Sequence, residues 1–239
     1  MSSANPFLPR IALVAEGPTD TVVIEAGLKA MLKRPFVLNV LQPERTNPRA
    51  VNGWCGVYKW CEAFRAGGAA SLEADPKLSQ FDMVIVHLDA DVAEKNYADC
   101  GALTGAIAPI GVLSLPCAQP CPPSVNTVAA LEAVLLSWLG IAVVGNKTVL
   151  CIPSKALESW LTASIRPTGD ALLNNLECRN DLSAKLEQLP KKEKIRKGVR
   201  AYECVGDEVT RHWALVCALC TQAASFDSRV KPIAQAFPP

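Results

Sequence analysis

The chain has 239 residues, half of them hydrophobic, and a formal net charge of +1. This length fits one large domain or one and a half ordinary ones, with enough apolar residues for a sizeable core. The balanced charge excludes a global basic excess, so any contact with nucleic acid has to be local. No uninterrupted run of about 18 apolar residues is present, which argues against a membrane span. The polar start MSSANPFLPR is not typical of a signal peptide, and we expect a cytoplasmic protein without a membrane partner.

Strand and helix patterns alternate through the first two-thirds of the chain. Short apolar runs rich in β-branched residues predict strands, and longer amphipathic segments predict helices. The expected order is strand 10–16, helix 20–34, strand 35–42, helix 56–67, strand 81–91, helix 124–140, strand 147–153 and helix 154–164. Such alternation predicts the α/β class, with a parallel sheet flanked by helices on both faces. From about residue 165 the chain looks wholly helical.

Acidic residues end two of the predicted strands. Glu16 follows the run ALVA, and Asp89 and Asp91 end the run VIVHLDAD. In a parallel α/β sheet, ligands bind at the carboxyl ends of the strands. Two carboxylates two residues apart on an extended segment point the same way, and they repel one another unless a cation lies between them. The natural partner is a hard divalent ion, Mg²⁺ or Mn²⁺.

The segment GPTD after Glu16 carries a further acid. Asp20 can face back toward the same site once the helix begins. The alternative is that Asp20 only complements the positive end of the helix, although Val22 stands where a capping box would have Glu or Gln. We expect Gly17 to let the backbone turn sharply between the strand and the helix, with no side chain in the way.

Two charged residues follow the last predicted strand. Glu158 could reach the same edge as a ligand of a second metal ion, because a two-metal mechanism needs more acids than one Asp pair supplies. It could equally lie on an ordinary amphipathic helix. Lys155 lies one turn earlier and is a candidate for stabilising charge on a scissile phosphate.

A basic run, KLEQLPKKEKIRKGVR, lies at 185–200. A local patch of this kind can bind a phosphate backbone without sequence preference, whereas most charge runs are merely solvated. The candidate nucleic-acid contacts are Lys191, Lys192, Lys194, Arg196, Lys197 and Arg200.

The chain has only two histidines, His87 and His212. Strand alternation places His87 on the same side as Asp89. A catalytic role is conceivable there, but a hydrogen-bonded core histidine is the favoured interpretation.

The ten cysteines have irregular spacings that do not predict a zinc site. Cys217 and Cys220 form a C-x-x-C in an apolar helical stretch, where cysteine packs as a small hydrophobe. Cys117 and Cys121, in the Pro-rich LPCAQPCPPS, are better metal or redox candidates.

The two acidic motifs, VAEGPTD and the later VIVHLDAD, resemble a Toprim domain, the catalytic fold of topoisomerases, primases, some RNases and the OLD-family nucleases. EGPTD is similar to the OLD-like branch, in which a second acid follows the glutamate by four. IPSKALESWL is similar to a segment of small stand-alone Toprim proteins found among bacterial defence genes. The resemblance covers about residues 10–165. It departs at Ala93, where topoisomerases often have a third acid, and the length leaves no room for a topoisomerase tyrosine domain or a fused ATPase.

The resemblance implies a function and a division of the chain. Glu16 would be a general acid/base or metal ligand, Asp89 and Asp91 would hold Mg²⁺, and Asp20 would be a further ligand. The chain would comprise a Toprim-like catalytic domain over 1–165 and a helical C-terminal region over 166–239 packed on it. The implied function is a Mg²⁺-dependent nuclease acting on DNA or RNA, with phage defence as a candidate context and a separate ATPase as a candidate partner.

Two alternatives stay open. An Asp-x-Asp motif also suits a glycosyltransferase that binds a metal–nucleotide-sugar complex, although that interpretation leaves EGPTD unexplained. The other alternative is a non-catalytic Toprim-like module that binds nucleic acid or a partner protein without cutting.

Overall fold

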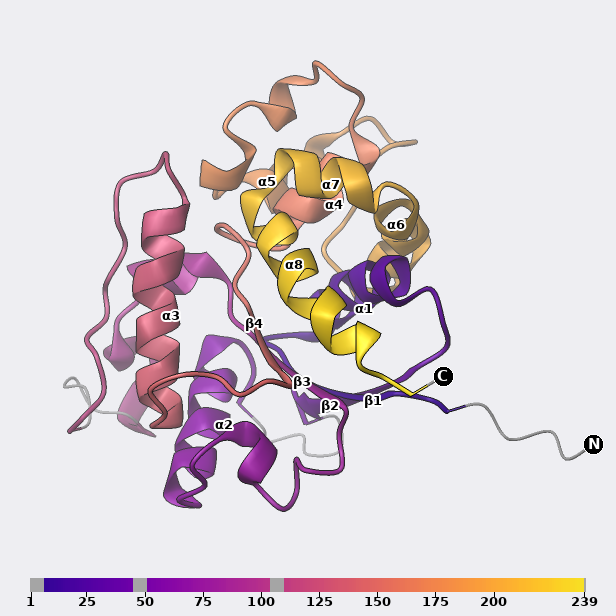
Figure 1. Cartoon of the computed structure of the whole chain (residues 1–239). Coiled ribbons are helices and arrows are strands. Elements are labelled where there is room, and N and C mark those ends of the chain that lie inside the picture. Colours follow the sequence, from indigo (N-terminus) through magenta and orange to yellow (C-terminus); the bar gives the residue numbers. More distant parts are fainter. Residues whose placement is uncertain (1–6, 45–50, 104–109, 239) are drawn as a thin grey trace, which may run out of the picture.

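The structure, a computed structural model, describes residues 7–44, 51–103 and 110–238 (Figure 1). Its centre is a four-stranded parallel sheet with the spatial order β2-β1-β3-β4. The strands are β1 (Arg10–Val14), β2 (Val37–Gln42), β3 (Met83–His87) and β4 (Thr148–Cys151). The helices are α1 (Pro18–Leu32), α2 (Trp54–Ala66), α3 (Val125–Leu139), α4 (Glu158–Ile165), α5 (Leu182–Gln188), α6 (Val199–Arg211), α7 (Trp213–Leu219) and α8 (Thr221–Gln235). The predicted α/β class with a parallel sheet is therefore confirmed.

Helices cover both faces of the sheet, as predicted. Successive side chains of β1 alternate between two core clusters, with Ile11 and Leu13 in one and Ala12 and Val14 in the other. The first cluster contains α1, α4 and the C-terminal helices, and the second contains α2 and α3. Figure 1 shows α2 and α3 on one side of the strands and α1 and α8 on the other. Burial on both faces explains why β3 and β4 are apolar without alternation.

The strand order creates a switch point at the centre of the sheet. β1 lies between β2 and β3, so the connection through α1 leads to one side of β1 and the connection through α2 leads back to the other. The carboxyl ends of β1 and β3 flank the place where the direction changes. Open α/β sheets bind ligands in this crevice. The fold therefore brings the residues that follow β1 and β3 to the position most suited to a site.

The strands are shorter than the sequence patterns predict. β1 ends at Val14 and β3 at His87, so the acids follow the strands instead of ending them. Helix α1 begins at Pro18, which is favoured at a first helical position because its missing N–H is not needed there. Helix α4 begins at Glu158 and not at residue 154, because Lys155 adopts a left-handed backbone conformation with φ 60°.

The prediction that the chain is wholly helical after residue 165 is wrong. Residues 166–181 contain only short 3₁₀ turns, and the basic residues 191–197 lie in turns and loop between α5 and α6. Pro190 follows α5 and cannot supply the N–H that a continuing helix needs. One core cluster contains residues from both sides of residue 165, and α6 packs directly on α1.

Within the described residues, every helix is too short or too polar to cross a bilayer.

Candidate functional site

The two acidic motifs meet at the switch point. Glu16 follows the end of β1 by two residues, and Asp89 follows the end of β3 by two. Glu16 Oε1 accepts a hydrogen bond from the backbone N–H of Asp89 at 2.7 Å. The structure thus joins the residues that the sequence singles out from two separate strands.

Asp89 lines a small pocket of about 140 Å³ beside this contact. Acidic and basic side chains share its wall. The acids are Asp89, Asp91 and Glu158, and the cations are Lys155, Arg179 and Lys197. The pocket also contains Asn180 and Ser183, so part of its wall comes from the C-terminal region.

Asp20 is buried in the first turn of α1, and both interpretations of it agree with its position. Its carboxylate accepts a hydrogen bond from the backbone of Gly17, which stabilises the start of the helix. The nearby charge of Glu158 contributes to the raised pKa of Asp20. Gly17 has an extended backbone with φ −150°, which any residue can adopt, so the expected need for a special turn conformation is wrong, whereas the expected need to keep a side chain out of the way is not. A Cβ at Gly17 would lie 3.3 Å from Asp20 Oδ2, and the glycine instead leaves room for that carboxylate.

The carboxylates raise one another's pKa values. Burial raises the pKa of Glu16 well above its usual value, and the charge of Asp89 adds to the rise. Burial also raises the pKa of Asp89, with further contributions from Asp20, Glu158 and Asp91. The pKa values of Asp20 and Asp91 are raised as well, again chiefly by burial. Strongly shifted acids in a cleft are typical of functional sites.

The donor set fits a hard divalent cation. Carboxylate oxygens are the ligands that Mg²⁺ prefers, and crowded like charges are what such an ion relieves. In the described part of the chain, no group of three or more His, Cys, Asp or Glu side chains is already placed around one ion position. Asp89, Asp91 and Glu158 line the pocket and Glu16 contacts the backbone of Asp89, but the five expected ligands are not gathered around one ion position. They are Glu16, Asp20, Asp89, Asp91 and Glu158.

Glu158 is buried at the start of α4 and is held from the C-terminal region. Its Oε1 accepts a hydrogen bond from the Tyr202 hydroxyl at 2.9 Å and lies 2.9 Å from Lys197 Nζ. Sequence reasoning missed Tyr202, because nothing in the amphipathic pattern of α6 distinguishes it from a core residue.

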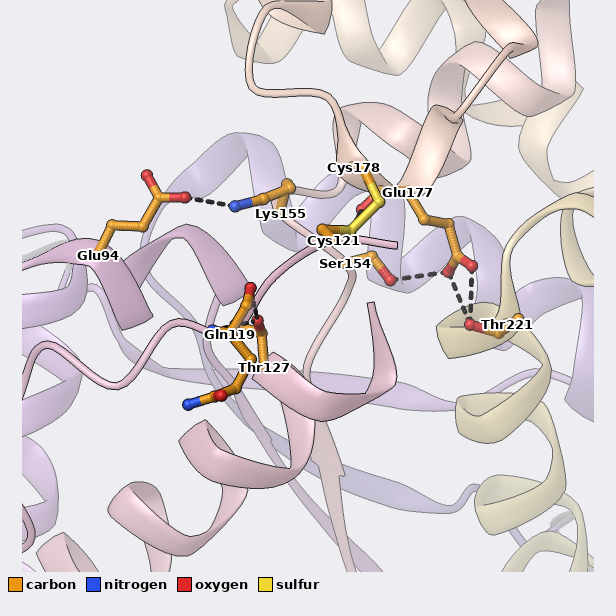
Figure 2. The surroundings of a disulfide bond; sticks show 9 residues. All are labelled: Glu94, Gln119, Cys121, Thr127, Ser154, Lys155, Glu177, Cys178 and Thr221. Carbon is orange, nitrogen blue, oxygen red and sulfur yellow. Dashed lines mark hydrogen bonds and ion pairs between the residues drawn. A yellow bond between two sulfur atoms is a disulfide. The ribbon is translucent and has the colours of Figure 1, made fainter. Parts of the chain in front are cut away.

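Lys155 lines the pocket but already has an anionic partner. Its ammonium group forms an ion pair with Glu94, in the 3₁₀ turn that follows Asp89 (Figure 2). The neighbouring Ser154 hydroxyl donates to Glu177 Oε1 at 2.7 Å, and Glu177 also accepts from Thr221. These bonds tie the loop after β4 to the C-terminal region.

His87 is a fully buried residue at the end of β3. Its Nε2 lies 3.1 Å from Asp89 Oδ1, so it is hydrogen-bonded within the core and also orients an acid of the site. His212 Nδ1 lies 2.9 Å from the carbonyl oxygen of Ser164, outside the acidic pocket.

The basic run divides between two places. Lys197 extends into the acidic pocket, whereas Lys192 and Lys194 line a separate cavity of about 700 Å³ beside Arg166. The remaining candidates are exposed to solvent: Lys191, Arg196 and Arg200.

Two disulfides, which the cysteine spacings do not predict, link distant parts of the chain. Cys55 bonds to Cys100, and Cys121 bonds to Cys178. The second bond joins the loop before α3 to the segment that carries Arg179 and Asn180 (Figure 2). Cys117 is a free, partly buried thiol. In the C-x-x-C motif, Cys220 is buried and Cys217 is partly buried, in line with their interpretation as packing residues.

No protein-family model matches the chain, and comparisons with curated proteins and with solved structures give no match. The resemblance to Toprim proteins therefore depends on the motifs alone. What the structure adds is the spatial position of those motifs at one edge of a parallel sheet.

Proposed function

We propose that the chain is a metal-dependent nuclease that cleaves phosphodiester bonds in DNA or RNA with Mg²⁺ or Mn²⁺. The observation that carries the proposal is the contact between Glu16 and the backbone of Asp89 at the switch point. Both motifs of the Toprim resemblance meet there, with three further carboxylates around them. This is the arrangement expected of a Toprim-like site with an OLD-like second acid.

Each residue has a role in this proposal. Asp20, Asp89, Asp91 and Glu158 would hold the ion, which supplies positive charge beside the reacting phosphate. Glu16 is oriented by the N–H of Asp89, burial raises its pKa, and it would act as general acid/base or as a metal ligand.

Substrate binding would use cations at the rim. Lys155 and Lys197 lie in the pocket wall, where either could face a phosphate oxygen. The exposed lysines and arginines of 191–200 would contact the phosphate backbone without reading sequence. A role in phage defence and a separate ATPase partner are proposed from the resemblance to Toprim proteins alone.

The test is a cleavage assay on purified protein. Supercoiled plasmid, single-stranded DNA and RNA are incubated with Mg²⁺ or Mn²⁺, with EDTA as the metal-free control. We expect cleavage by the wild type and none by Asp89→Ala or Asp91→Ala, with the variants folded as judged by circular dichroism. Equal cleavage by wild type and variants would indicate a contaminant, and no cleavage of any substrate would contradict the proposal.

The ion pairs of the site favour one second candidate. Glu158 is paired with Lys197, and Glu94 with Lys155, so the acids are partly compensated without any metal. A non-catalytic module would keep these pairs and bind nucleic acid equally well in EDTA. A nucleotide-sugar transferase would use Asp89 and Asp91 but would give Glu16 no role, and metal-dependent loss of a UDP-sugar would reveal it.

A further inference from the structure

Lys197 brings a positive charge into the acidic pocket from the loop before α6. Its backbone N–H donates to Glu187 Oε1 at 3.1 Å, which fixes the chain at this point. Its Nζ lies 2.9 Å from Glu158 Oε1, and half of the side chain is exposed, 50% against 4% for Glu158. The ammonium group therefore contacts a buried carboxylate although half of the lysine side chain is open to solvent.

The charge of Lys197 acts on the whole acidic group. Burial raises the pKa values of Asp20, Asp89 and Asp91, and the ammonium of Lys197 opposes the rise at each of them. Burial alone would lower the pKa of Lys197, but Glu158, Asp20 and Asp89 outweigh it, so that the pKa is raised. The direct contact of this ammonium group is with Glu158, and Asp89 and Asp91 line the same pocket.

We propose that Lys197 is a tethered counter-ion of the acidic pocket, which competes with the divalent cation and is displaced from Glu158 when that cation binds. The inference rests on the proposed function for the identity of the ion. It adds that the metal-free site is held in a charge-compensated state by the chain itself.

The geometry allows the displacement. A lysine side chain is a flexible stem with a compact charge, and half of this one is already exposed to solvent. At equal distance a divalent ion attracts each carboxylate twice as strongly as an ammonium group. Tyr202 remains as a hydrogen-bond donor to Glu158 after Lys197 leaves. The displaced ammonium then lies at the pocket mouth, where an incoming phosphate would meet it.

The experiment measures Mn²⁺ binding to the full chain, with free Mn²⁺ followed by electron paramagnetic resonance. Lys197→Gln removes the competing charge, so we expect it to bind Mn²⁺ roughly five- to tenfold more tightly than the wild type. Lys194→Gln is the matched control, because Lys194 lies on the same loop but is exposed and lines the other cavity. It should bind Mn²⁺ as the wild type does. Equal or weaker binding by Lys197→Gln would overturn the inference.

Two further measurements separate this inference from folding and from the proposed function. Lys197→Arg keeps the charge and should retain wild-type affinity, and thermal unfolding with and without Mn²⁺ reports whether each variant is folded. The Mn²⁺-induced rise in melting temperature should be larger for Lys197→Gln than for the wild type. Tighter Mn²⁺ binding by Lys197→Gln, together with no cleavage of nucleic acid by the wild type, would sustain the inference and refute the nuclease. Cleavage by the wild type, together with an unchanged Mn²⁺ affinity of Lys197→Gln, would support the nuclease and refute the inference.

Discussion

Acidic side chains lie at both edges of the sheet, and their neighbours differ. At the edge where the strands begin, Asp82 Oδ2 accepts the backbone N–H of Arg10 at 2.8 Å. Glu73 Oε1 accepts the N–H of Lys147 at 2.9 Å and the hydroxyl of Thr148 at 2.7 Å. Asp82 thus ties the start of β1 to the residue before β3, and Glu73 Oε1 ties the start of β4 to the 3₁₀ turn Leu72–Ala74, while Glu73 Oε2 is buried without a hydrogen-bond partner among the described residues.

At the edge where the strands end, the carboxylates face one another. The pKa values show the contrast. Burial by itself raises the pKa of Glu73, but hydrogen bonds from Thr148 and from backbone N–H groups lower it overall. Burial raises the pKa of Asp89, and its acidic neighbours raise it further. A carboxylate among donors stabilises the fold, whereas a carboxylate among carboxylates is poised to bind a cation.

The largest expected effect is on cleavage activity, and it distinguishes the acids at the two edges of the sheet. Glu16→Gln keeps the side-chain shape and the acceptor for the Asp89 N–H but removes the exchangeable charge. We expect the rate of nucleic-acid cleavage at saturating Mg²⁺ to fall by about 10²-fold or more, the usual scale of general acid–base catalysis.

The control for that variant is Glu73→Gln at the opposite edge, which should cleave at close to the wild-type rate. Wild-type turnover by Glu16→Gln would mean that the acid after β1 is structural. A comparable loss in both variants would mean that the edges do not differ in function.

A smaller effect separates the edges by stability. Glu73→Ala leaves the Thr148 hydroxyl and the Lys147 N–H without their acceptor, so the free energy of unfolding should drop by about 1–3 kcal/mol. Urea denaturation followed by circular dichroism measures this. An unchanged midpoint and slope would show that water replaces the carboxylate without cost.

The smallest effect concerns pH. The unfolded chain has carboxyl pKa values of about 4, and burial raises those of Glu16 and Asp89 in the native state, so the native state binds more protons above that pH. Stability of the metal-free protein should therefore fall as pH rises from about 4 through the raised pKa values.

Asp89→Asn should flatten this slope and match or exceed wild-type stability at neutral pH by up to about 1 kcal/mol, because it removes a repelling charge. Urea denaturation in EDTA at a series of pH values provides the measurement. Stability that rises with pH over the same range, with equal slopes in both proteins, would contradict the raised pKa values.

The sequence predicted the acids of the site better than their surroundings. Glu16 and Asp89 could be placed because each follows a short apolar run, and parallel strands bring such positions to one edge. Glu158 could be placed for the same reason. Lys197 and Tyr202 could not be assigned as partners of Glu158, because their contacts depend on how α6 packs against α1 and α4.

The backbone geometry at Gly17 and the cysteine pairing also could not be predicted from local sequence patterns. Gly17 looked like a turn glycine, but its backbone is extended and the nearby Asp20 carboxylate explains its lack of a side chain. The bond between Cys121 and Cys178 joins positions 57 residues apart, and irregular spacing leaves many pairings equally plausible.

The packing of Trp160 has a consequence for synthesis of the protein. Its fully buried ring meets Trp213 and Phe226 at centroid distances of 5.4 and 5.6 Å. A growing chain therefore carries all the acids of the site before it carries the aromatic partners that hold α4 in place. Until Phe226 has left the ribosome, Trp160 lacks one of these two aromatic partners. The packing that holds α4 is therefore complete only when α8 has been made.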